Sequence, residues 1–408
     1  MKMKNVVTVI DVGSTKVCCC IAKVFGDGTY NIIGVGYCAC VGMKNGTIVD
    51  MTSVEKSVAI AVESAEKMAR MRVSSAYVSV GGKNVASRII NMSLKIGGRI
   101  ITENDIVRLF AQVDENVVNE VVIHSVPVWY SLDSLNGVKD PIGMYANQLT
   151  VSMNVVTVPQ VQLQNILLCL TRCHLQVDGV ISSGYAAGVG IMSHDDMESN
   201  RLVIDFGGGS TTLSFFYNGI FCGSEVVSLG ARHITNDIVY GLNISKANAE
   251  RLKTLFGSAI PSISDDKEML FAPGAEEDDL INLQQISKAT LNQVIQARVE
   301  EILKNVKLKI DNSRFKNDFS KTILITGGGS LLTGIAEFSS VFLRCPVVLK
   351  KMKTVLPGTE IQINHDFSVA LGMINLAQTV DQFDSDKDEE KKGKNFLKKT
   401  LDWIKNNL

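Results

Sequence analysis

One short pattern occurs twice in this chain, far apart, and it constrains the fold more than any other feature. Val9–Thr15 reads as an apolar run ending in Asp11, followed by a turn containing glycine and hydroxyl residues. Val203–Thr211 repeats this order around Asp205. A second apolar run follows each copy, which predicts a strand, a tight turn and a returning strand. Because the copies lie too far apart for a solenoid, we predict two related halves.

A third glycine-rich turn, Gly327–Ser330, follows the apolar run Ile323–Thr326. Glycines allow a close approach of the backbone, whose N–H groups can then point at phosphate oxygens. Hydroxyls add donors, and an aspartate at a strand end can hold Mg²⁺ through its waters. Each turn alone is typical of an ordinary hairpin. Three in this order favour a nucleotide site over structural turns, and the sequence has no P-loop motif.

Between and after these turns, periodicity predicts the remaining elements. Amphipathic helices are expected near 54–71, 161–173 and 246–256, and a long one carries Leu291, Ile295, Val299, Ile302 and Val306 on one face. The segment 83–160 is predicted to be an inserted α+β subdomain, with a helix near 103–115 and strands near 121–130 and 148–157.

Composition excludes several classes of protein. The formal net charge is −1 for 408 residues, so no basic excess suggests a nucleic-acid partner. The nine cysteines include no C-x-x-C motif, and an odd, loosely spaced set suits a reducing cytosol. Cys169, Cys173 and His174 have helical spacing for a metal site, but the favoured interpretation is buried apolar thiols. No signal peptide or transmembrane stretch is predicted.

The C-terminal end has a different character. Residues 381–394 are strongly charged and predict a disordered linker. Residues 395–408 form an amphipathic pattern at about 100° per residue. Its apolar arc contains Phe396, Leu397, Leu401, Trp403, Ile404 and Leu408, and its polar arc contains Lys398, Lys399, Asp402 and Lys405. This predicts an interfacial helix that binds anionic lipid, the alternative being a helix packed on the protein's own core.

The order of the motifs resembles the actin, hexokinase and Hsp70 superfamily, with connecting helices expected at Asp178–Ala187 and Phe367–Gly372. Within it, Asn31–Gly36, Gly46–Asp50, Val126–Tyr130 and Val138–Gly143, together with the position of the inserted subdomain, resemble the FtsA family of bacterial cell-division proteins. The implied fold is α/β and actin-like, with two RNase-H-like halves around a nucleotide cleft.

The resemblance implies a division of the chain. Residues 1–82 and 161–198 would form the first half and 83–160 its inserted subdomain. Residues 199–231 and 312–380 would form the second half, 232–311 its nucleotide-capping and partner subdomain, 381–394 the linker and 395–408 the membrane helix.

The resemblance also assigns residues. Asp11 and Asp205 would hold Mg²⁺ through its waters, beside the phosphates. Donors to phosphate would be Gly13, Ser14, Thr15, Lys16, Gly207, Gly208, Gly209, Ser210 and Thr211. Adenosine would meet Glu250, Lys253, Gly327, Gly328, Gly329 and Ser330. For Lys16 an exposed hairpin lysine is nearly as good an interpretation, and for Glu250 and Lys253 a solvated surface pair is equally good.

The implied function is to bind ATP and Mg²⁺, to self-assemble on the cytoplasmic face of the cell membrane at the division septum, to tether FtsZ filaments and to recruit later division proteins. The FtsZ C-terminal tail would dock on residues 232–311, with Arg298 as a candidate contact, for which a bare solvated arginine is at least as good an interpretation. The alternatives are a PilM-like pilus-assembly adaptor and a small-molecule kinase of the same fold. Since Val180–Ile191 contains no carboxylate or amide to position water, we expect at most slow ATP hydrolysis.

Overall fold

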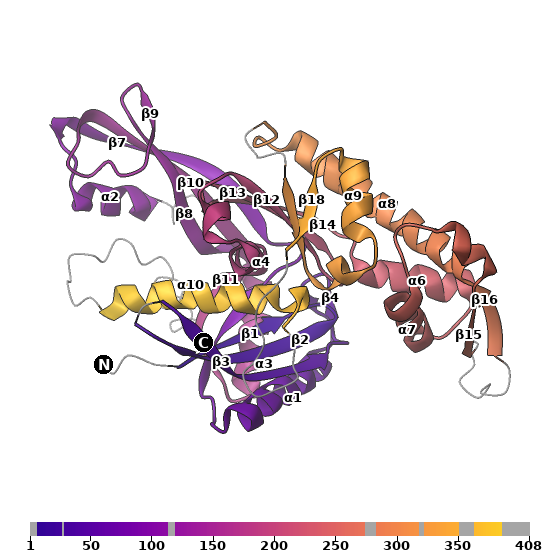
Figure 1. Cartoon of the computed structure of the whole chain (residues 1–408). Coiled ribbons are helices and arrows are strands. Elements are labelled where there is room, and N and C mark those ends of the chain that lie inside the picture. The colour runs from indigo at the N-terminus through magenta and orange to yellow at the C-terminus, as the bar shows by residue number, and fades with distance from the viewer. Residues whose placement is uncertain are drawn as a thin grey trace.

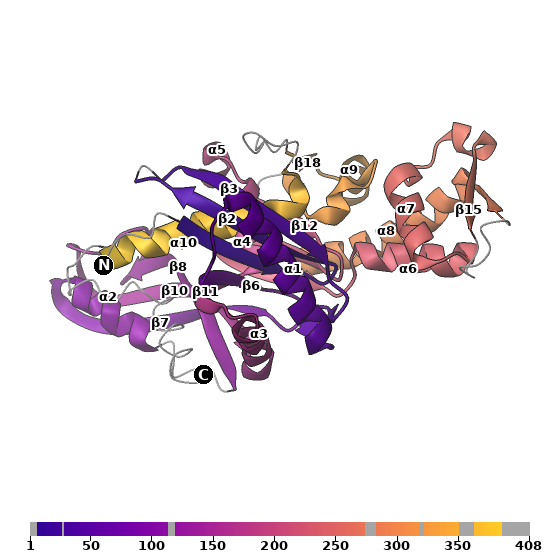
Figure 2. The same ribbon diagram turned by 90° about the horizontal axis from the view of Figure 1, so that it is seen from below.

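The computed structural model describes residues 6–26, 28–112, 119–273, 283–317, 322–350 and 363–385. Two five-stranded sheets form the centre of the molecule. From this centre, the elements between Ala86 and Pro159 project in one direction and those between Ala231 and Asn312 in another (Figures 1 and 2).

The two sheets have the same topology. The first has the order β11(Gln176–Ser182), β6(Ser75–Val80), β1(Val6–Val12), β2(Lys16–Val24), β3(Tyr30–Ala39). The second has the order β18(Val347–Leu349), β17(Ile323–Thr326), β12(Arg201–Phe206), β13(Thr211–Tyr217), β14(Ile220–Val227). In both, the strand that ends near the aspartate pairs antiparallel with the next strand and parallel with a later one. The prediction of two related halves is confirmed.

The expected helices form with small shifts of their ends. α1(Met51–Ala69) begins after the N-cap Asp50, whose carboxylate accepts a hydrogen bond from the Ser53 N–H. Its apolar face packs on the first sheet, where Val54, Val58 and Ala61 are fully buried. α3(Gln160–Arg172) packs beside it. The stretch Cys18–Cys20 lies in β2 and is buried.

One connecting helix was placed too early. Residues 176–182 form strand β11, and helix α4(Ser183–Ile191) begins only at Ser183. The apolar run Gly179–Ile181 pairs in parallel with β6, and this tertiary pairing overrides the local pattern. The return helix α10(Ser368–Ser385) extends beyond the expected Gly372 and includes the first residues of the predicted linker.

α4 and α10 cross with their backbones in contact. A Cβ on Gly372 would overlap the Ala186 carbonyl oxygen, and one on Gly190 would overlap the Ser368 carbonyl oxygen. Only glycine permits this approach, which fixes the two connecting helices to each other between the halves.

The inserted subdomain is an antiparallel sheet in the order β7(Ala86–Ile100), β10(Tyr145–Pro159), β8(Glu120–Leu132), β9(Leu135–Val138), with α2(Glu103–Phe110). The strand β7 was not predicted. Its burial pattern is mostly exposed or intermediate, so it lacks the continuous apolar run of a core strand. The predicted helix near 103–115 ends at Phe110.

Buried polar contacts join this subdomain to both halves. The His124 Nε2 in β8 accepts a hydrogen bond of 2.8 Å from the N–H of Ser182, which ends β11 directly before α4. The Asn154 side-chain amide in β10 donates to the Phe221 carbonyl of β14, at 3.3 Å. His124 also meets the Tyr185 ring edge to face. The inserted subdomain is therefore attached to the first half and to the second.

The second projecting group contains α6(Ala231–Leu242), α7(Lys246–Phe256), the hairpin of β15(Met269–Pro273) and β16(Leu283–Ser287), and α8(Lys288–Asn312). The predicted apolar face of the long helix is confirmed, since Leu291, Ile295, Val299, Ile302 and Val306 are all fully buried. This face packs on the core of the second half.

Across the described segments, no helix combines the length and apolarity that crossing a bilayer requires. The predicted membrane helix, 395–408, lies outside the described residues, as does most of the predicted linker.

We predict that His124 makes folding stability fall in mild acid. Burial lowers its pKa from 6.5 to about 4, so between these values the unfolded chain binds the extra proton. The stabilisation is complete above pH 6.5 and is lost as the pH falls towards 4. His124→Gln keeps an acceptor for the Ser182 N–H without titrating, and should flatten the dependence of the unfolding free energy on pH by up to about 3 kcal/mol.

The measurement is urea unfolding between pH 4 and 7.5. The control is His194→Gln, which changes an exposed histidine on α5(His194–Met197) and should leave the profile of the unaltered protein unchanged. If the unfolding free energy of the unaltered protein and of His124→Gln changed with pH in the same way, His124 would not titrate as its burial requires.

Candidate functional site

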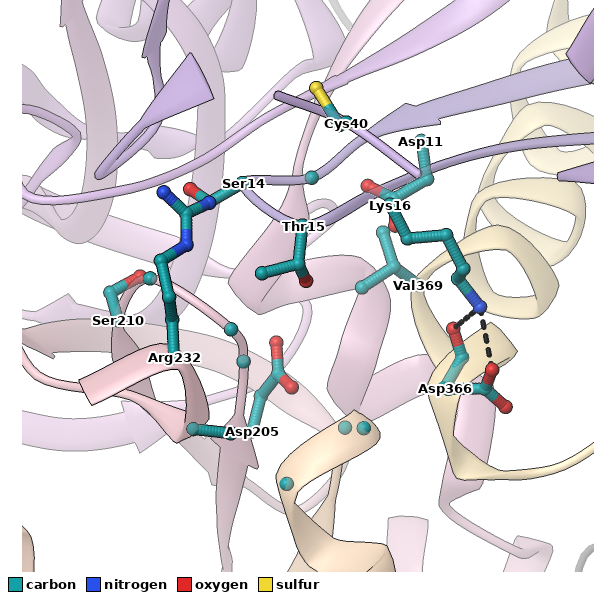
Figure 3. Close-up of a pocket in the computed structure, with 18 of the residues that line it drawn as sticks. Asp11, Ser14, Thr15, Lys16, Cys40, Asp205, Ser210, Arg232, Asp366 and Val369 are labelled. Carbon is teal, nitrogen blue, oxygen red and sulfur yellow. Dashed lines mark hydrogen bonds and ion pairs between the residues drawn. The ribbon is translucent and has the colours of Figure 1, made fainter. Parts of the chain in front are cut away.

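The three glycine-rich turns meet in one cavity of about 850 Å³ between the two halves (Figure 3). Most of the predicted site residues line it, namely Asp11, Gly13, Ser14, Thr15, Lys16, Asp205, Gly207, Gly208, Gly209, Ser210, Glu250, Lys253, Gly327, Gly328 and Gly329. They come from both sheets and from the group of α6 and α7, so only the tertiary fold brings them together.

The first two turns face each other directly. A Cβ on Gly209 would lie 2.6 Å from the Ser14 Oγ, and one on Gly208 would overlap the Thr15 side chain. The first turn is closed by a hydrogen bond of 2.9 Å from the Gly13 N–H to the Lys16 carbonyl. Bare backbone at 208 and 209 therefore lies against two hydroxyl side chains, an arrangement that can surround an anion with donors.

Asp11 and Asp205 stand near the ends of equivalent strands, β1 and β12. The Ser79 hydroxyl donates to the Asp11 carboxylate at 2.6 Å and accepts from the Val12 N–H at 3.1 Å, which fixes the position of Asp11. No described residue donates a hydrogen bond to the Asp205 carboxylate. Burial, with the nearby Asp11 charge, raises the pKa of Asp205 to about 7, and burial also raises the pKa of Asp11.

This pair of carboxylates fits a hydrated divalent cation. Two enclosed like charges favour a cation between or beside them, and carboxylate oxygens are suitable partners for Mg²⁺ and its waters. Within the described segments, no group of three or more His, Cys, Asp or Glu side chains forms a cage for a metal. A cation here would therefore complete its shell with water or with oxygens of a bound anion.

The third turn packs against the second aspartate. Gly327 has a φ of 86°, and a Cβ there would overlap the Asp205 Oδ1. Two predicted residues, Thr211 and Ser330, do not line the cavity. The Thr211 hydroxyl donates to the Leu229 carbonyl at 2.8 Å, and the Ser330 hydroxyl donates to the Gly327 carbonyl at 2.7 Å. Both side chains are buried and stabilise the turns from behind.

Lys16 is not an exposed hairpin lysine. Its ammonium group donates to the Asp366 carboxylate at 2.7 Å and to the Asp366 carbonyl at 2.8 Å (Figure 3). It also lies 3.9 Å from the centre of the Phe367 ring. The first turn is thereby joined to the segment that begins α10.

Glu250 and Lys253 are also more than a solvated surface pair. They form an ion pair of 2.7 Å, and each makes a hydrogen bond with the Thr235 hydroxyl of α6. Both line the cavity on the side of α7. Their position in the cavity wall favours contact with a ligand over the interpretation as a solvated surface pair.

Sequence reasoning missed Arg232, which lies near the start of α6 and lines the cavity. Its Nη1 donates to the Met43 carbonyl of β4(Met43–Lys44), in the first half, at 3.2 Å. The only local signal is its place directly after the Gly230-Ala231 pair that precedes an amphipathic helix. The direction of its side chain depends on the way the halves pack.

Arg298 lies away from the cavity, on α8. Its guanidinium forms a two-pronged pair with Asp237 of α6, with Nη2 2.8 Å from Oδ1, and also pairs with Glu301. It is therefore not a bare solvated arginine but a link between α6 and α8. The predicted membrane-contact residues Phe396, Leu397, Lys398, Lys399, Leu401, Trp403, Ile404, Lys405 and Leu408 lie outside the described residues.

Comparison with known proteins identifies the family. The family model described as "Cell division protein FtsA" matches residues 202–372, and that of the "SHS2 domain inserted in FTSA" matches residues 82–157. The "Cell division protein FtsA" of Agrobacterium fabrum is 33% identical over 392 residues, which cover 93% of this chain and 88% of that protein.

Solved structures show the likeness of fold. A structure of the "PilM-PilN type IV pilus biogenesis complex" matches with a TM-score of 0.64 at 14% identity, covering 90% of this chain and 97% of that one. MreB5 of Spiroplasma citri, bound to ADP, matches with a TM-score of 0.57 at 13% identity, covering 94% and 100%. At these identities only the fold is shared, and it is the predicted actin-like ATPase fold.

The shared fold alone leaves the pilus-assembly alternative open, but the sequence identity does not. Both family models and the near full-length match to a curated relative agree with one another and with the inserted subdomain seen here. The chain belongs to the FtsA family of cell division proteins.

Proposed function

We propose that this protein binds ATP with Mg²⁺ in the cavity, assembles on the cytoplasmic face of the membrane through residues 395–408, tethers FtsZ filaments at the division septum and recruits later division proteins. The observation that carries the proposal is the convergence of three glycine-rich turns and two enclosed carboxylates in one cavity. Membership of the FtsA family supports the role in cell division.

In this proposal the phosphates lie between the first two turns. Backbone N–H groups and the hydroxyls of Ser14, Thr15 and Ser210 are available there as donors. Mg²⁺, when bound, neutralises phosphate charge and is held through its waters by Asp11 and Asp205. The adenosine lies against Gly327–Gly329, with Glu250 and Lys253 at its ribose and base. Thr211 and Ser330 support this site without touching the ligand.

We further propose that hydrolysis is slow. The described residues that line the cavity include no Asn or Gln, and Glu250 is engaged by Lys253. Ser183, at the start of α4, offers only a hydroxyl near Gly81. In this proposal Asp11 and Asp205 hold Mg²⁺, and Asp366, which also lines the cavity, pairs with Lys16. No other carboxylate or amide of the described lining is left to orient water, so nucleotide would act as a conformational switch.

We propose that the chain is divided at the boundaries predicted from its sequence, and that each subdomain has its own task. The group 232–311 would both cap the nucleotide through α7 and hold the FtsZ tail. The inserted subdomain 83–160 would meet later division proteins. Arrays of weakly bound C-terminal helices would hold firmly by avidity, which is a physical reason for self-assembly.

The nucleotide site is tested by calorimetric titration with ATP, with and without Mg²⁺. We predict that chelating Mg²⁺ weakens ATP binding by about tenfold or more, and that Asp205→Asn does the same at saturating Mg²⁺. Asp195→Asn, an exposed change on α5, is the matched control and should bind like the unaltered protein. Failure of the unaltered protein to bind ATP at any Mg²⁺ concentration would refute the proposal.

The same variant yields a prediction about stability. Since the folded state raises the pKa of Asp205 from 3.8 to about 7, the folded protein binds the extra proton between these values. The contribution of Asp205 to the unfolding free energy therefore falls as the pH rises from about 4 to 7. Without nucleotide at pH 8, Asp205→Asn should unfold at a higher temperature than the unaltered protein. An equal or lower melting temperature would contradict this.

The membrane helix is tested by sedimentation with vesicles that contain anionic lipid. We predict that Leu401→Glu, on the apolar arc, weakens binding by about tenfold or more, because it removes apolar burial and adds a negative charge at the lipid. The matched control is Asn406→Glu, which adds the same charge on the polar arc and should have a much smaller effect. Equal effects of the two changes would mean that charge alone governs binding.

The FtsZ contact is tested with a peptide of the FtsZ C-terminal tail. If the tail contacts Arg298, Arg298→Gln should weaken binding by about tenfold. Asp237→Asn should strengthen it, because it removes the carboxylate that competes for the guanidinium. Reduced thermal stability of both variants with unchanged peptide affinity would limit Arg298 to linking α6 and α8.

A further inference from the structure

Arg232 lines the cavity, and its guanidinium has no carboxylate partner among the described residues. Its main chain is fixed on the second turn, because the Ala231 N–H donates to the Gly207 carbonyl at 2.9 Å and the Arg232 N–H donates to the Gly208 carbonyl at 2.8 Å. The helix α6 thus begins directly on the turn that is proposed to hold phosphate. A movement of this turn would carry Arg232 with it.

The side chain crosses from the second half to the first. Its Nη1 donates to the Met43 carbonyl at 3.2 Å, and Figure 3 shows the side chain extending from α6 towards the first half. Met43 itself is buried in the hydrophobic core of the first half. The side chain of Arg232 therefore links the second turn, where its main chain is held, to β4 of the first half.

The other cations of the cavity are already neutralised or lie at its rim. Lys16 pairs with Asp366, Lys253 pairs with Glu250, and Lys246 is exposed. None of the described carboxylates pairs with Arg232, whose one hydrogen bond there is to a neutral carbonyl. A guanidinium with donors to spare suits a phosphate, which it can hold through two parallel hydrogen bonds.

We propose that Arg232 binds the terminal phosphate of the nucleotide and sets the preference for a triphosphate over a diphosphate. This inference rests on the proposed function. The adenosine end of the cavity is bordered by Gly327–Gly329, and Gly327 lies against Asp205 where the second turn begins. The guanidinium reaches beyond that turn to Met43 of the first half, away from Asp205 (Figure 3). A phosphate chain running from the third turn between the first two reaches Arg232 with its last phosphate.

A bound terminal phosphate would also strengthen the link between the halves. It would give the guanidinium an ionised acceptor in addition to the Met43 carbonyl, and charge-assisted hydrogen bonds are about twice as strong as neutral ones. Loss of that phosphate would leave only the single bond to Met43. The same residue would therefore favour closure of the cavity with triphosphate and relax it with diphosphate.

The test is calorimetric titration of the full chain with Mg²⁺ and either ADP or the non-hydrolysable β,γ-imido analogue of ATP. Arg232→Gln should weaken binding of the triphosphate analogue by about 10- to 100-fold, and weaken ADP by less than about threefold. Arg232→Lys keeps the charge but loses the planar fork, and should lie between Arg232→Gln and the unaltered protein. Arg251→Gln, an exposed change on α7 outside the cavity lining, is the matched control and should leave both affinities unchanged.

The outcomes separate the two proposals. Retained ADP binding by Arg232→Gln shows that the variant folds, so a selective loss of the triphosphate analogue supports this role for Arg232. Equal losses for both nucleotides, or no loss for either, would overturn it while leaving the nucleotide site in place. If Arg232→Gln does not fold, an Arg232→Lys variant with an unchanged ratio of the two affinities would overturn it too. Absence of binding of either nucleotide to the unaltered protein would overturn the proposed function itself.

Discussion

Two carboxylates enclosed near each other are the constraint on which the arrangement of this molecule depends. Each ends a central strand of one sheet, so the two halves cannot close on one another without bringing Asp11 and Asp205 together. Ser79 supports Asp11, whereas Asp205 has no described donor and a pKa raised to about 7. The fold thus concentrates unfavourable charge where a ligand can relieve it, a common origin of functional sites. The stability of the closed arrangement and the occupancy of the cavity are then linked thermodynamically.

The elements that depend on local patterns could be predicted from the sequence. The strands around Asp11 and Asp205 follow from apolar runs that end at glycine turns, and the apolar face of α8 follows from helical periodicity. The repeated topology of the two sheets could be predicted because the pattern itself is repeated. Strand β7 could not, because most of its residues are exposed or only partly buried. The start of α4 was missed because pairing of β11 with β6 decides it.

The side chains of the site were less predictable, for one physical reason. Residue types indicate what a group can bind, but not the direction in which it points. Lys16 meets Asp366 across most of the length of the chain, and Arg232 meets Met43 across the cavity. Thr211 and Ser330 belong to the right turns but face their own backbone. These side-chain orientations follow from the packing of segments that are distant in the sequence. A local sequence pattern therefore does not predict them.

The glycine crossing of α4 and α10 determines which kind of motion the two halves can make. Shear between packed helices requires an intervening layer of side chains that can change rotamers as one helix slides past the other. At Gly190 and Gly372 no such layer exists, because backbone touches backbone. Sliding would drive carbonyl oxygens into Cα atoms, whereas rotation about the point of contact keeps its spacing. A movement of the two halves that keeps this contact would therefore be a rotation about the crossing and not a slide along it.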